Sequence, residues 1–108
     1  MTRGRLPKKG LEDAILVAKA RGTVMNFLQN RDSLCDFMII GNGNLVVVRV
    51  RKVRRIRDTR EDFEREFQDP IKGLRSFPSS GLILKYLWIY SRHGIWRFFR
   101  MEDTGMIE

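Results

Sequence analysis

CDFMIIGNGNLVVVRVR, residues 35–51, is the stretch of sequence that decides the fold. Two apolar, β-prone runs flank the Asn42-Gly43 pair, a typical type I′ hairpin turn in which both residues accept positive φ angles. A loop of two or of four residues gives the same register, in which Asp36 lies directly opposite Arg49. A loop of three residues would place these two side chains on different faces of the sheet. We favour the even loop, because it pairs apolar with apolar residues as far as Asp36.

Helix and strand patterns surround this hairpin. Residues 10–20 have the apolar spacing of a helix, and residues 23–28 form a short β-prone run. After the hairpin, residues 59–74 again have helical spacing, whereas residues 82–90 and 95–101 are aromatic-rich strands. The order is helix, three strands, helix, two strands. It predicts a single α/β (α+β) domain whose mixed central sheet of about five strands is flanked by two helices.

The ends of the elements and of the domain also have sequence signals. Thr59 is a good N-cap for the second helix, with Asp62 completing a capping box. Asp69-Pro70 predicts a kink or a restart in that helix. We expect residues 1–9 to be a basic flexible arm, residues 10–101 to form the domain, and residues 102–108 to be a loose acidic tail.

The composition is that of a globular protein, with 43% hydrophobic and 31% charged residues in 108. Cys35 is the only cysteine and forms no internal disulfide, which fits a reducing compartment. The sequence has no apolar run long enough to span a membrane and no recognisable signal peptide. We therefore expect a cytoplasmic protein that does not bind a membrane.

The net charge of +8 is concentrated in two places. Residues 49–60 contain seven basic residues and one acid, and residues 1–10 contain four basic residues and no acid. Concentrated arginine and lysine favour a polyanion partner, although a solvated basic face is the plainer alternative. We expect nucleic acid, most simply DNA, to be bound by the seven basic residues: Arg49, Arg51, Lys52, Arg54, Arg55, Arg57 and Arg60.

The order of elements and the stretch DFMIIGNGNLVVVRVRK, residues 36–52, resemble the PD-(D/E)XK nuclease superfamily. The similarity is greatest to its small archaeal branch of Holliday-junction-resolvase-like proteins. It covers residues 10–101, and LWIYSRHGIWRFFRM, residues 87–101, resembles the strand pair that closes such domains. The resemblance implies a restriction-endonuclease-like fold.

The chemistry of this family implies a metal. An Asp, together with an acid two residues before a Lys on the central strand, binds Mg²⁺, and the Lys polarises the attacking water. Carried over, Glu12 matches the family's helix acid, Asp36 the Asp, Arg49 the second acid and Arg51 the Lys. Arginine stays protonated, so it neither binds a metal nor acts as a base. We therefore expect a degenerate scaffold without catalytic residues, metal or magnesium-dependent cleavage, in which Asp36 and Arg49 form an ion pair.

Two other functions are open alternatives. The first is an active magnesium-dependent endonuclease with migrated ligands, namely Asp36 and Glu12 with Asp13 or Asp32. The second is a structural homodimerisation module that associates through its aromatic strands. Tyr86, Trp88, Trp96 and Phe98 alternate along these strands, which indicates a core or an interface more than base stacking. His93, the only histidine, lies in a predicted turn and is expected to be solvated.

Overall fold

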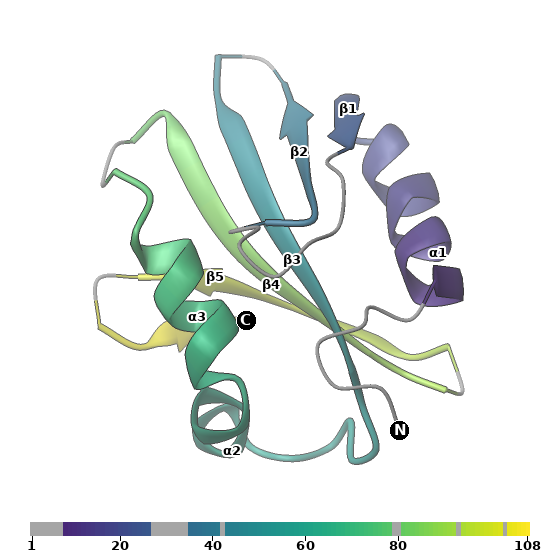
Figure 1. The fold of residues 1–108 in the computed structure, drawn as a ribbon, viewed down its shortest axis with the longest axis vertical. Helices are drawn as coiled ribbons and strands as arrows, with labels where there is room; N and C mark the ends of the chain where they lie inside the picture. The colour runs from purple at the N-terminus through teal and green to yellow at the C-terminus, as the bar shows by residue number, and fades with distance from the viewer. Residues whose placement is uncertain (1–7, 27–34, 42, 79–80, 93, 103) are drawn as a thin grey trace.

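Within the described residues, the chain forms three helices and one mixed sheet of six strands (Figure 1). The structure is a computed structural model that describes residues 8–26, 35–41, 43–78, 81–92, 94–102 and 104–108. The elements are α1 (Lys8–Lys19), β1 (Thr23–Asn26), β2 (Phe37–Ile40), β3 (Leu45–Val53), α2 (Arg60–Glu66), α3 (Gln68–Arg75), β4 (Ile83–Ser91), β5 (Trp96–Met101) and β6 (Met106–Ile107). The predicted α+β class with a mixed sheet is confirmed, and the sheet has six strands where about five were expected.

The central hairpin has the register that the sequence predicts. Strands β2 and β3 are antiparallel, and Ile40 pairs with Leu45. The backbone N–H of Gly41 donates a hydrogen bond to the carbonyl of Asn44 at 3.2 Å. Gly43 has a φ of 81°, which glycine adopts without strain. The even loop therefore holds Asp36 beside the second half of β3.

Strand β3 lies at the centre of the sheet because β4 pairs with it in parallel along its whole length. The paired residues run from Leu45 and Ile83 to Val53 and Ser91. The strands lie in the order β1-β2-β3-β4-β5-β6, and every other neighbouring pair is antiparallel. Strand β3 runs past β2, and its arginine-rich second half does not form a sheet edge. The crossover through α2 and α3 places β4 against that half instead.

The helices cover opposite faces of the sheet, with α1 on one side and α2 and α3 on the other (Figure 1). Alternate residues of β3 face the two sides, which explains its nearly continuous apolar run. The core under α1 contains Ala14, Ala18, Phe37, Ile39, Val48, Val50, Trp88 and Tyr90. The core under α2 and α3 includes Val47, Phe63, Phe67, Ile71, Leu74, Leu87, Ile89 and Phe99.

The second helical segment starts as predicted but breaks earlier. Thr59 caps α2, and the capping box with Asp62 is present in both directions. The chain leaves the helical conformation at Phe67 and restarts at Gln68, so two helices replace one. Pro70 is therefore not the break. It lies in the first turn of α3, where a missing N–H removes no hydrogen bond within the helix.

Both ends of the predicted domain need correction. Helix α1 begins at Lys8, so the helix includes the end of the expected basic arm, and residues 1–7 lie outside the described residues. The tail is not loose, because β6 pairs with β5 and Met106 is buried in the core. None of the helices in the described part of the chain combines the length and the apolar character needed to cross a membrane.

Candidate nucleic-acid interface

The buried carboxylate of Asp36, one residue before β2 begins, continues the ladder of hydrogen bonds between β2 and β3. The backbone N–H of Asp36 donates to the carbonyl of Val48 at 2.8 Å. Its Oδ2 accepts a hydrogen bond from the backbone N–H of Val50 at 2.6 Å. Asp36 is only 1% exposed. The side chain therefore takes the place of a strand residue and satisfies a donor of β3 that β2 no longer reaches.

Two arginines of β3 lie beside this carboxylate. Nη1 of Arg49 is 3.6 Å from Oδ1 of Asp36, and Nη1 of Arg51 is 3.6 Å from Oδ2. Their side chains are 13% and 21% exposed, and Arg51 also donates to the carbonyl of Val50 at 2.7 Å. The expected ion pair between Asp36 and Arg49 is confirmed, and Arg51 joins it.

Burial dominates the electrostatics of this triad. Burial raises the pKa of Asp36, although the hydrogen bond from Val50 and the charges of both arginines lower it. Burial and the neighbouring Arg49 lower the pKa of Arg51, and Asp36 opposes both. Within the described residues, Oδ1 of Asp36 and Nε and Nη1 of Arg49 have no hydrogen-bond partner. The triad is thus a buried cluster of charges whose hydrogen-bonding groups are only partly satisfied.

The residues around Asp36 do not fit the magnesium ion that the family resemblance implies. Two guanidinium groups flank the carboxylate and repel a cation, and Val50 occupies one of its oxygens. Glu12 and Asp13 are exposed on α1, which covers the opposite face of the sheet. Asp32 lies outside the described residues. In the ranges that the structure describes, no three His, Cys, Asp or Glu side chains come together in a possible metal site.

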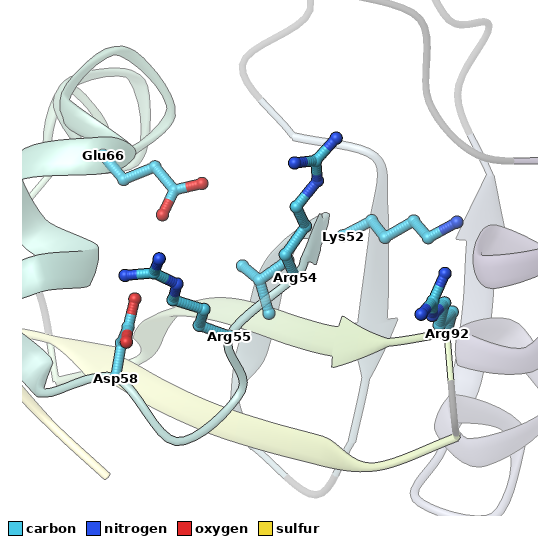
Figure 2. Close-up of a pocket in the computed structure, with 7 residues that line it drawn as sticks. Lys52, Arg54, Arg55, Asp58, Glu66 and Arg92 are labelled. Atoms are coloured by element: carbon cyan, nitrogen blue, oxygen red, sulfur yellow. The ribbon is translucent and has the colours of Figure 1, made fainter.

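A basic pocket lies at the carboxyl ends of the parallel strands β3 and β4. Val53 pairs with Ser91, so Arg54 and Arg92 follow directly on neighbouring strands. The open pocket has a volume of about 990 Å³ and is lined by Lys52, Val53, Arg54, Arg55, Asp58, Glu66 and Arg92 (Figure 2). The carboxyl ends of parallel strands are a common place for ligands to bind in open sheets.

The charges in this pocket are unevenly distributed. Figure 2 shows Lys52 and Arg92 extending toward one side, and Arg55 toward the other side, where Asp58 and Glu66 lie. Burial and the charge of Asp58 raise the pKa of Glu66. Four bases face two acids here. Among the described residues, no ion pair holds any of these four bases.

The backbone of the loop after β3 is held in place by Arg97 of β5. Its Nη1 donates to the carbonyls of Ile56 and Asp58 at 2.8 and 2.7 Å. The guanidinium carbon lies 5.2 Å from the centre of the Phe63 ring and 5.0 Å from that of Phe99. Ile56 is itself buried against the core. Arg97 and the core therefore hold the backbone of this loop in place, while its basic side chains stay exposed.

The structure separates the seven basic residues that the sequence places in one interface. Arg49 and Arg51 are largely buried with Asp36, whereas Lys52, Arg54 and Arg55 line the pocket. The other two lie outside the pocket. Arg57 is exposed and does not line it. The guanidinium of Arg60 lies 3.7 Å from the carboxylate of Glu61 and 3.9 Å from that of Glu64, and it donates a hydrogen bond to the carbonyl of Met106.

Sequence reasoning missed Arg92 because this residue lies in the turn between β4 and β5. Its place in the pocket follows from the parallel pairing of β3 and β4, which puts Arg92 beside Arg54. A helical crossover between two apolar strands is a signal of parallel pairing. The helical crossover therefore indicates that the carboxyl end of β4, where Arg92 follows, lies next to the basic loop after β3.

Comparisons of the chain with models of protein families, with curated proteins and with solved structures found no match. The pocket is therefore interpreted from its own geometry and charge.

Proposed function

We propose that this protein binds the phosphate backbone of nucleic acid in the pocket at the carboxyl ends of β3 and β4. The observation that carries this proposal is that Lys52, Arg54, Arg55 and Arg92 line one pocket without ion-pair partners among the described residues. Basic side chains that are free of acidic partners favour phosphate oxygens, and arginine binds them with two parallel hydrogen bonds.

The scaffold is proposed to be a restriction-endonuclease-like domain that has lost its catalytic metal site. Two observations support this part of the proposal. The order of helix, three strands, helical segment and strand pair agrees with the family pattern. The family's acid and lysine positions on the central strand hold Arg49 and Arg51, which surround Asp36 with positive charge. Binding is then the function of the protein, and strand cleavage is not.

Binding of this kind has a recognisable salt dependence. Phosphate contacts release counterions, and each contact contributes about −0.9 to the log–log slope of affinity against salt on duplex DNA. Four contacts give a slope of roughly −3.6. Because phosphate contacts do not read base edges, we expect little sequence preference.

The proposal is tested by removing two charges from the pocket. The double variant Arg54→Gln and Arg92→Gln should bind DNA at least about tenfold more weakly at low salt, because each contact is a charge-assisted hydrogen bond. Its salt slope should be shallower by about 1.8. Lys72→Gln is the matched control, since Lys72 is an exposed base on α3 that does not line the pocket. The measurement is fluorescence anisotropy at several salt concentrations.

Two results would contradict the proposal. One is a wild-type protein that does not bind DNA or RNA at low salt. The other is a folded double variant whose affinity and salt slope equal those of the wild type, or change no more than those of Lys72→Gln.

A further inference from the structure

Aromatic side chains cluster on the sheet face that α1 covers only in part, and some of them reach the surface. Tyr90 pairs with Trp96 and Trp88 pairs with Phe98, so the four side chains share one face of β4 and β5. They pack together with the core under α1. Helix α1 packs mainly on β1, β2 and β3. The rings of Trp96 and Phe98, and that of Tyr86, stay partly exposed as a result.

These rings are ordered with respect to one another. The planes of Trp96 and Phe98 differ by 4°, with centroids 6.0 Å apart. Tyr90 and Trp96 are inclined by 29°, with centroids 5.1 Å apart. Trp88 is fully buried and meets Phe98 edge to face at 4.9 Å. Because folding already fixes these rings, a ligand that stacks on them does not have to order their side chains.

Positive charge borders this aromatic surface on several sides. Lys52 of the basic pocket lies opposite Tyr90 in the parallel register, so it faces the same side of the sheet. The guanidinium carbon of Arg21 lies over the Phe98 ring, 5.1 Å from its centre, and 5.2 Å from the centre of the Trp88 ring. Arg100 lies opposite Tyr86, but its Nε is 3.4 Å from a carboxylate oxygen of Glu102. Lys52 therefore connects this face to the phosphate-binding pocket, and Lys52 and Arg21 place positive charge beside the partly exposed rings.

We propose that the occupant of this surface is a single-stranded nucleic acid whose bases stack on Trp96. This inference rests on the proposed function, because the same strand would place its phosphates in the pocket beside Lys52. Every nucleobase has a π-face, so stacking is tolerant of sequence. The bases of a duplex are already stacked on one another, and such a ligand can use only the phosphate contacts.

The first test needs no change to the protein. Binding is measured for a strand of about 12 thymidines, for an abasic strand of the same length and for a duplex of the same length. The phosphates of the thymidine and abasic strands are alike, so a difference between them reports on the bases. We expect the thymidine strand to bind more tightly than the abasic strand by roughly five- to a hundredfold, the range for stacking of one base.

The second test changes the rings. Trp96→Leu should reduce affinity for the thymidine strand by a similar factor and leave affinity for the abasic strand and its salt slope unchanged. Trp96→Phe retains a ring and should recover most of the lost affinity. Phe77→Leu is the matched control, because Phe77 packs against the core on the opposite face. Thermal unfolding checks that each variant is folded.

The outcomes separate this inference from the proposed function. Equal binding of the thymidine and abasic strands by the wild type overturns base stacking, while phosphate binding in the pocket still stands. Tighter binding of the duplex than of the thymidine strand overturns it too. If none of the three nucleic acids binds, both proposals fail.

Discussion

Asp36 shows how one side chain connects the hairpin register to the chemistry of the central strand. Its carboxylate accepts the N–H of Val50 and lies between Arg49 and Arg51. The pairing with Arg49 was predictable, because the Asn-Gly turn determines which residues face each other. The contact with Arg51 was not, since it depends on the reach of a long side chain and on the position of Asp36, one residue before β2 begins.

Removing the carboxylate should destabilise the fold strongly. Asp36→Ala leaves the buried N–H of Val50 without an acceptor and two largely buried arginines without a counter-charge. We expect a loss of about 3–5 kcal/mol in the free energy of unfolding, as for other broken buried ion pairs. Asp36→Asn should cost less, because its amide oxygen can still accept the hydrogen bond from Val50. Urea unfolding followed by tryptophan fluorescence measures both. Equal stability of Asp36→Ala and the wild type would show that the triad does not hold the strand.

At the scale of elements, local signals predicted the structure well and tertiary contacts supplied the rest. The hairpin and the capping box of Thr59 and Asp62 depend on neighbouring residues, and both were predicted. The sequence predicted the break at Pro70, but it lies at Phe67. From the sequence alone, a proline that interrupts a helix cannot be distinguished from one in the first turn of a new helix. Strand β6 was missed because two residues give no measurable periodicity.

The last residues of the chain are held by an ion pair whose contribution depends on pH. Both carboxylate oxygens of Glu108 accept hydrogen bonds from Arg97, at 2.8 and 2.7 Å. Hydrogen bonding to Arg97 lowers the pKa of Glu108 below its ordinary value of 4.5. Since the folded state has the lower pKa, the pair stabilises the protein above about pH 4.5, and this contribution is lost as the pH falls through the lowered pKa.

Glu108→Gln should therefore be less stable than the wild type at neutral pH and converge with it in acid. Glu108 is half exposed and solvent screens the pair, so we expect a difference of up to about 1 kcal/mol. Urea unfolding at several pH values measures it. Glu12→Gln is the control, because Glu12 forms no ion pair among the described residues. A difference that stays constant from neutral to acidic pH would contradict the role of the pair.

At the scale of the whole molecule, topology decides which candidate residues can act together. Helix α1 and the Asp36 triad lie on opposite faces of the sheet, so Glu12 does not lie beside Asp36 as the family resemblance implies. The parallel pairing of β3 and β4 instead brings Arg92 to Arg54. The sequence predicted the cluster of basic residues. It did not predict which of them are buried in the triad and which line the exposed pocket. That division depends on how far β2 and β4 extend along β3.

The most direct test of nucleic-acid binding at the pocket is a titration of the ¹⁵N-labelled protein with a short thymidine strand, followed by the NMR shifts of backbone amides. We predict the largest shifts at residues 52–58 and at Arg92, around the carboxyl ends of β3 and β4. Amides of α3, which packs on the sheet face opposite α1, serve as the internal reference and should move least. Shifts concentrated on α3, or no shifts at low salt, would contradict binding at this pocket.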